Sequence, residues 1–243
     1  MFVIRIADLN VRIENRYDLI LGKCQSYLTS ACAPPDLSVG MTETDIQNLR
    51  DNVLKYKGKA ISEPEAEYNG THHRIYPNLS RFQAFWLHAC VIAMDGWGYA
   101  FSARPGTGKT THALEWLKRF PDKARIINGD NPIIRKKDGI FFAYGTPFPG
   151  KEGYNENRSV PLKGLCFLHR AETNRIERLD PAIAMMRLFW GNRCIHQMDE
   201  ECVQSHLDIY NDFVERVPIY LFHVNNFLPD TVEVAYRGMQ GGR

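Results

Sequence analysis

Apolar and charged residues alternate with a period of two near the N-terminus. The runs FVIRI and VRI, on either side of residues 8–10, predict two short strands. A proline-rich stretch, TSACAPPDLSV, separates these strands from a predicted helix, which begins at Thr42 with the capping-box-like sequence TETD and continues with apolar residues at helical spacing. We therefore expect residues 1–75 to form a small N-terminal α+β region.

The apolar segments after residue 78 follow one another in an order typical of an α/β domain. We predict a buried helix over LSRFQAFWLH, then a hairpin of the strands ACVIAM and GYAFSA that turns at Asp95 and Gly96. Further predicted elements are helices at residues 108–120, 181–190 and 199–217, a hairpin at IIRKKDGIFFAY, and strands at ARIIN, LKGLCFLHR, IYLFHV and TVEVAYRG. This order predicts that residues 76–243 form one α/β domain on a mixed sheet.

Charge and hydropathy exclude several classes of partner. With 30 Lys and Arg against 28 Asp and Glu, the net charge of +2 gives no reason to expect nucleic acid. The longest apolar run, residues 84–94, is far shorter than the roughly 20 residues of a membrane-spanning helix, and the N-terminus lacks the pattern of a signal peptide. None of the six cysteines forms a CxxC pair, so we expect reduced thiols and a cytoplasmic protein.

Two groups of polar residues are interpreted without a binding role. The basic run from Arg135 to Lys137 precedes a turn, which indicates the solvated end of a hairpin rather than a binding patch. His72 and His73 are adjacent, and on a strand their side chains would point apart. We therefore expect no zinc site at these histidines.

A glycine-rich stretch follows the predicted strand GYAFSA. Residues 103–110, ARPGTGKT, match the phosphate-binding pattern GxxxxGK[ST] at every position except the first, where Ala103 replaces glycine. Such a loop gathers backbone N–H groups and a helix N-terminus around phosphate oxygens, while its lysine reaches the outer phosphates and its threonine offers a hydroxyl to Mg²⁺. The residues expected to bind the nucleotide are Arg104, Pro105, Gly106, Thr107, Gly108, Lys109, Thr110 and Thr111.

An acidic residue follows the next predicted strand. In RIINGDNPII, Asp130 ends an apolar run about 20 residues after the glycine-rich loop, where a carboxylate can reach a metal bound to the nucleotide. A lone aspartate at a strand end is also often a turn former or a helix cap. The phosphate-binding loop before it favours the functional interpretation, with Thr110 and Asp130 as the metal ligands.

The segment HACVIAMDGWGYAFSARPGTGKTT resembles, without a gap, a stretch of the HPr kinase/phosphorylases. His88 stands at the family's histidine, Gly96 and Gly98 stand at its turn glycines, and GTGKT stands at its loop. The loop is also similar to the kinase-1 motif of ATP-dependent phosphoenolpyruvate carboxykinases, whose chains are much longer. The resemblance extends over residues 76–230 and is strongest at residues 88–132.

The resemblance implies a mixed-sheet P-loop kinase domain of the HPr kinase and PEP carboxykinase type, with ATP and Mg²⁺ as cofactors. The reaction that it implies is phosphate transfer from ATP to a hydroxyl, and we expect a serine of a protein or peptide as the acceptor. Lys109 would hold the phosphates, Asp130 would be the base or the metal carboxylate, and His88 would lie near the transferred phosphate. For His88, a buried histidine satisfied by the backbone is the alternative. Among partners we expect a protein or peptide substrate, no nucleic acid and no membrane, and we leave open whether the chain forms a homo-oligomer.

The chain departs from the family's pair of adjacent acids. Asp130 is flanked by a glycine and by Asn131, so one of the two carboxylate roles is unfilled or is supplied elsewhere. This departure favours a catalytically weak nucleotide-binding regulator as the alternative to an active protein kinase. A small-molecule kinase is a third candidate, which the open substrate loop does not exclude.

The segment from Tyr144 to Asn157 contains three glycines, two prolines and charges of both signs. We interpret it as an exposed loop, either a mobile lid over the acceptor with Lys151 near the phosphate or an ordinary long connection. Beyond it, VPLKGL resembles the family's ExRG motif, because it keeps a cation at Lys163, but Pro161 stands in place of the acid. Glu152 and Glu156 are the candidates to replace this acid.

Overall fold

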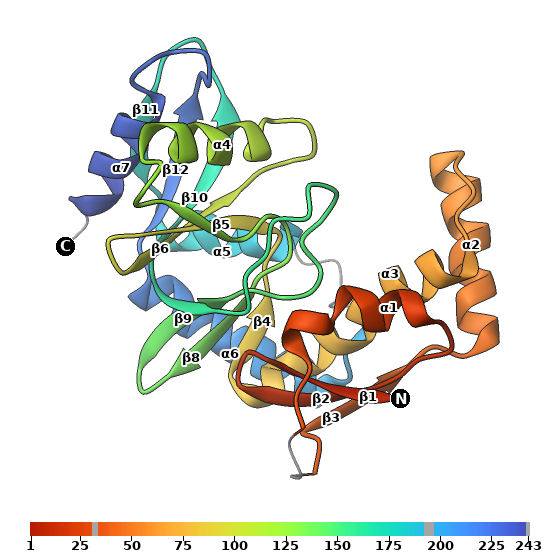
Figure 1. The fold of residues 1–243 in the computed structure, drawn as a ribbon. Helices are drawn as coiled ribbons and strands as arrows, with labels where there is room; N and C mark the ends of the chain where they lie inside the picture. Colours follow the sequence, from red (N-terminus) through yellow and green to blue (C-terminus); the bar gives the residue numbers. More distant parts are fainter. Residues whose placement is uncertain (31–33, 192–196, 242–243) are drawn as a thin grey trace.

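The computed structural model describes residues 1–30, 34–191 and 197–241, and Figure 1 shows the arrangement of their elements. The N-terminal elements are β1 (Phe2–Ile6), β2 (Leu9–Glu14), α1 (Asp18–Lys23), the 3-10 helix η1 (Gln25–Tyr27), β3 (Leu37–Gly40), α2 (Glu43–Lys57), α3 (Glu63–Ile75) and the 3-10 helix η2 (Tyr76–Phe82). The elements that follow are β4 (Ala84–Trp86), β5 (Ala89–Met94), β6 (Trp97–Ser102), α4 (Lys109–Arg119), β7 (Arg125–Asn128), β8 (Ile133–Lys137), β9 (Ile140–Tyr144), β10 (Ser159–Arg170), β11 (Arg175–Arg178), α5 (Pro181–Gly191), α6 (Glu200–Arg216), β12 (Ile219–Val224) and α7 (Thr231–Gln240). The fold is mixed α/β, as expected.

The large sheet is organised around the long strand β10. The first residues of β10 pair antiparallel with β9, while its later residues pair parallel with β6 on one side and with β12 on the other. Beyond β6 the order continues through β5 to β7, and β5 is antiparallel to both of its neighbours. Consequently β6, β7, β10 and β12 all run in one direction, and their C-terminal ends meet at a single edge of the sheet, where β5 begins. In open α/β sheets, ligands bind at such an edge.

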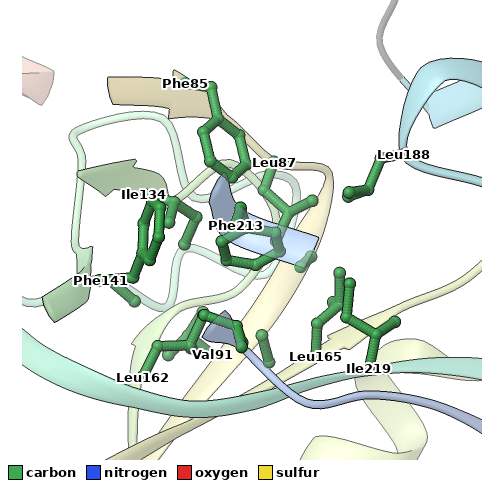
Figure 2. Close-up of a cluster of buried hydrophobic side chains, with 14 of the residues drawn as sticks. Phe85, Leu87, Val91, Ile134, Phe141, Leu162, Leu165, Leu188, Phe213 and Ile219 are labelled. Atoms are coloured by element: carbon green, nitrogen blue, oxygen red, sulfur yellow. The ribbon is translucent and has the colours of Figure 1, made fainter. Parts of the chain in front are cut away.

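Helices cover both faces of this sheet, because the side chains of each strand alternate between the faces. On β5, Ala89 and Val91 join the core under α5 and α6, whereas Cys90 and Ile92 join the core under α4 and α7. Figure 2 shows the first core, in which Phe213 of α6 lies among side chains of several strands. In Figure 1, α4 and α7 lie together on the other face. The domain therefore has three layers, with the sheet in the middle.

The N-terminal region forms a second, three-stranded sheet in the order β1-β2-β3. Its β1–β2 hairpin confirms the strands predicted at FVIRI and VRI, and α2 begins with the predicted capping box at Thr42. The buried cluster beneath this sheet includes Ile4 and Ile75 together with Trp86 and Phe148. The N-terminal region therefore packs directly onto the rest of the chain.

Two predicted elements differ from the structure. TVEVAYRG was expected to be a strand but forms α7, because Val232, Ala235 and Met239 lie at helical spacing and all three are buried against the sheet. The helix expected over LSRFQAFWLH is wrong in its second half. The 3-10 helix η2 ends at Phe82, the next residue Gln83 has a φ of +56° in the left-handed region, and the apolar residues after it form β4. A short buried apolar run does not distinguish a helix from a strand.

The helix α3 was missed, although its signal is present in the sequence. Ser62 and Glu65 form a capping box, and a proline occupies the first turn. His72 and His73 lie on this helix and not on a strand, with ring centres 4.1 Å apart. Burial lowers the pKa of His72 to about 3, so this ring is neutral.

Further expectations concern the cysteines, membrane-spanning helices and the basic run. The described cysteines at positions 24, 90, 166 and 202 are free and buried, while Cys32 and Cys194 lie outside the described residues. None of the helices in the described part of the chain has the length and apolar character needed to cross a bilayer. The basic residues near the β8–β9 turn form ion pairs within the protein: Lys136 pairs with Asp212 at 2.7 Å and Lys137 pairs with Asp8 at 3.1 Å.

Candidate active site

The glycine-rich loop singled out in the sequence connects β6 to α4. Its two glycines have backbone conformations that other residues rarely adopt, with φ of +79° at Gly106 and +108° at Gly108. Within the loop, the N–H of Thr107 donates to the carbonyl of Arg104 at 3.1 Å. Among the described residues no side chain caps α4, and the N–H groups of its first turn have no acceptor inside the helix. The loop therefore presents an open helix N-terminus, which is suited to bind an anion.

Lys109, Asp130 and His88 meet beside this helix N-terminus. The Nζ of Lys109 forms an ion pair with Oδ1 of Asp130, and Nε2 of His88 lies 3.1 Å from the same oxygen. His88 immediately precedes β5, Lys109 begins α4, and Asp130 follows β7. The sheet brings these three ends to one edge, so the three residues expected to be catalytic are in direct contact.

The carboxyl of Asp130 is held in its ionised form. Burial alone would raise its pKa, but the hydrogen bond with His88 and the positive charge of Lys109 outweigh burial and lower the pKa from 3.8 to about 2. A carboxylate with so low a pKa is a strong electrostatic partner and a weak proton acceptor. Withdrawal of Lys109 towards a phosphate group would raise this pKa.

The turn that carries Asp130 is fixed by Asn128, which is completely buried. The Oδ1 of Asn128 accepts from the backbone N–H of Asp130 at 2.9 Å and from that of Asn131 at 2.7 Å. Its Nδ2 donates to the carbonyl and to the hydroxyl of Thr146, both at 3.1 Å. Sequence reasoning missed Asn128, although it lies two residues before Asp130. Its role depends on Thr146, which is distant in sequence.

The segment between β9 and β10 packs against this turn. Residues 145–149 are buried and residues 150–154 are exposed, so the expectation of an exposed loop is wrong for the first half. A Cβ at Gly145 would lie 1.9 Å from the carbonyl oxygen of Glu156, and a Cβ at Gly150 would lie 2.8 Å from the Cβ of Asp130. The buried half is therefore held by close backbone packing, and the exposed tip, which includes Lys151, begins directly beside Asp130.

The position next to Asp130 has a structural role. The amide of Asn131 donates to the carbonyl of Phe148 at 2.8 Å and accepts from the indole N–H of Trp86 at 3.0 Å. Of the two acids considered as substitutes, Glu156 pairs with Arg158 at 3.5 Å, and Glu152 lies on the exposed tip that begins beside Asp130.

Two residues that the sequence did not single out hold the loop from the side opposite Asp130. Arg170, at the end of β10, donates to the carbonyls of the two residues that precede Gly108. Asn226, which follows β12, donates to the carbonyl of Gly108 at 3.2 Å and contacts the buried ring of His112 at 3.1 Å. The contact of Asn226 with Gly108 spans 118 residues of sequence, so no local pattern indicates it.

Lys163 lies away from the loop. Its Nζ is 5.4 Å from the centre of the Trp97 ring. Trp97 begins β6, and the loop follows the other end of this six-residue strand. At 3.3 Å per residue, the two ends are about 16 Å apart. The structure therefore does not bring Lys163 to the other expected site residues.

Comparison with known proteins identifies the family to which this chain belongs. The model of the family described as "SynChlorMet cassette protein ScmC" matches residues 67–227, which is more than half of the chain and includes every site residue described above. The chain belongs to the ScmC family. A comparison with curated proteins gave no match. Among solved structures, that of the Hpr(Ser) kinase/phosphatase from Coxiella burnetii is similar at 13% identity and a TM-score of 0.37, covering 65% of this chain and 99% of that chain. Similarity at this level does not establish a shared fold.

The site of this ScmC-family chain fits a magnesium ion that is bound partly through phosphate. Among the described residues, no group of three or more His, Cys, Asp or Glu side chains could hold a metal by itself. Mg²⁺ typically takes one or two carboxylates and completes its shell with phosphates and water. The carboxylate of Asp130 and the partly exposed hydroxyl of Thr110 would supply such a set.

Proposed function

We propose that this ScmC-family protein is an ATP-dependent kinase of the HPr-kinase type, which transfers phosphate to a hydroxyl of a protein or peptide. The observation that carries the proposal is the contact of Lys109 and His88 with Asp130 beside the open N-terminus of α4. In this proposal the glycine-rich loop would bind phosphate, Lys109 would contact the outer phosphates and Asp130 would bind the metal, all at one edge of the sheet.

The chemistry assigns a task to each group. Mg²⁺, when bound, would neutralise charge on the phosphates and orient them. The loop amides and Lys109 would hold the outer phosphates, while Asp130 and Thr110 would hold the metal. In the transfer step, a bond forms between the acceptor oxygen and the terminal phosphorus, and the bond from that phosphorus to ADP breaks. The acceptor proton passes to a base, and His88, which contacts Asp130 at 3.1 Å, is our candidate for this role.

The acceptor would approach from the exposed tip at residues 150–154, because this tip borders Asp130. A serine is the acceptor that the family resemblance favours, and no feature of the site favours nucleic acid or a membrane. We also propose that the protein acts in the cytoplasm.

A nucleotide-binding regulator is the second candidate, and one observation favours it. The low pKa of Asp130, about 2, makes this carboxylate a weak base, and the adjacent Asn131 is engaged by Trp86 and Phe148. A protein of this kind would bind MgATP through the same loop without rapid turnover.

Measurement of ADP release separates the two candidates. Wild type, Lys109→Ala and the control Lys118→Ala, which changes an exposed lysine on the same helix, are incubated with MgATP and serine-containing peptides, free serine or no acceptor. We expect peptide-dependent ADP release by wild type and by the control. In Lys109→Ala this release should be at least about 100-fold lower, because a charge that stabilises the transition state is lost.

Two results would contradict the assignments. If wild type binds MgATP but releases no more ADP with any acceptor than Lys109→Ala does, the kinase proposal is wrong and the regulator remains. If Asp130→Asn keeps full turnover, the proposed role of Asp130 is wrong.

A further inference from the structure

Phe227 is the most exposed large apolar side chain among the described residues, with 95% of its surface accessible. It lies in the connection between β12 and α7, directly after Asn226, which binds the phosphate-loop residue Gly108. Single exposed apolar residues are common on protein surfaces. Phe227, however, directly follows the residue that binds the glycine-rich loop, so a ligand of that loop could contact it.

The backbone that carries Phe227 is rigidly held. The side chain of Asn225 accepts from the N–H of Phe227 at 3.1 Å and donates to the carbonyl of Glu172 at 3.0 Å. The N–H of Asn225 donates to the side chain of Asn174 at 2.7 Å, and its carbonyl accepts from the hydroxyl of Thr231 at 2.6 Å. The aromatic ring is therefore carried on a fixed backbone, so a ligand that stacks on it would have to order the Phe227 side chain but not the connection that carries it.

The strand order indicates how a bound nucleotide would be oriented along the edge of the sheet. Asp130 follows β7, on one side of the phosphate-loop strand β6, whereas Phe227 follows β12, on the other side. Lys109 pairs with Asp130, so the outer phosphates and the metal belong on the β7 side. The inner phosphate and the nucleoside would then extend to the other side of the loop, towards β10 and β12.

Asn226 brings Phe227 close to this path. A Cβ built at Gly108 would lie 2.8 Å from the Nδ2 of Asn226, so the β12–α7 connection touches the loop at the residue before α4. A base that leaves the loop in this direction would lie on the side of the loop where Phe227, the residue after Asn226, is exposed. Aromatic rings bind bases by stacking, and this contact tolerates different bases because every base has a π-face.

We propose that Phe227 stacks on the base of the bound nucleoside triphosphate and forms the nucleoside end of the site. This inference rests on the proposed function, because it requires that the loop binds a nucleotide. It adds the orientation of the nucleotide across the sheet edge and a residue that contacts its base.

Isothermal titration calorimetry with the full chain tests this proposal. The ligands are MgATP and magnesium tripolyphosphate, which has the phosphates but no base. The proteins are wild type, Phe227→Ala, Phe227→Trp and the control Tyr56→Ala, which removes a 75% exposed aromatic ring on α2. Because Phe227 makes no buried contact, the variants should fold like wild type.

We expect Phe227→Ala to weaken MgATP binding by about tenfold and to leave tripolyphosphate binding unchanged. Phe227→Trp should bind MgATP like wild type or more tightly, and Tyr56→Ala should bind both ligands like wild type. Stacking is wrong if Phe227→Ala binds MgATP like wild type, or if it loses both ligands equally. If wild type binds neither ligand, the proposed function itself is wrong and the stacking proposal falls with it.

Discussion

Replacing Asn128 with alanine removes four hydrogen bonds from a side chain that solvent does not reach. Two of these bonds fix the backbone of the turn that carries Asp130, and the other two join this turn to Thr146. A hydrogen bond contributes about 0.5–1.5 kcal/mol to stability, and a buried group left without its partner adds a further cost. Four bonds at about 0.5–1.5 kcal/mol each give about 2–6 kcal/mol, and we expect a loss of about 3 kcal/mol, in the lower half of this range, because all four bonds share one side-chain amide.

Urea denaturation followed by tryptophan fluorescence measures this loss. The midpoint should fall while the slope of the free energy of unfolding with urea stays unchanged, because the surface exposed on unfolding is the same. Asn52→Ala is the matched control, since Asn52 is exposed on α2, and we expect its effect to stay within about 0.5 kcal/mol. A loss below about 1 kcal/mol in Asn128→Ala would refute the view that this amide holds the turn.

Two further predictions concern the same turn. Gly145→Ala should destabilise the protein by at least about 3 kcal/mol, because the new Cβ would lie 1.9 Å from the backbone oxygen of Glu156. The control Gly22→Ala, whose Cβ would have no atom within 4 Å, should not destabilise it, and equal urea midpoints of the two variants would contradict this reasoning. Asp130→Asn should cost up to about 2 kcal/mol at pH 7, because the folded protein lowers the pKa of this carboxyl from 3.8 to about 2. The stabilisation is present above about pH 4 and is lost as the pH falls towards 2, so the free energies of unfolding of wild type and variant should converge in acid. A difference between these free energies that stays constant from about pH 7 to about pH 3 would show that the charge of Asp130 does not cause it.

Local sequence was sufficient for several elements of the site. The β5–β6 hairpin and the helix that starts at Lys109 follow the predicted pattern, because turn glycines and the spacing of apolar residues act over a few neighbouring positions. The capping boxes at Thr42 and Ser62 likewise connect residues three positions apart. The second was overlooked, although the sequence contained it. Family resemblance directed attention to His88, which no local rule would have selected.

The tertiary structure alone decided which of these residues meet. The contact of His88 with Asp130, the support of Asp130 by Asn128 and Thr146, and the binding of Gly108 by Asn226 all depend on the order and register of strands. A strand's own sequence indicates which side chains face each side of the sheet, but not which strand will lie next to it. The same limit explains α7, whose short apolar pattern fitted either a strand or a helix until its place against the sheet selected the helix. The sequence by itself therefore determined the glycine-rich loop and the helix that follows it, and the packing of distant segments determined which residues surround the loop.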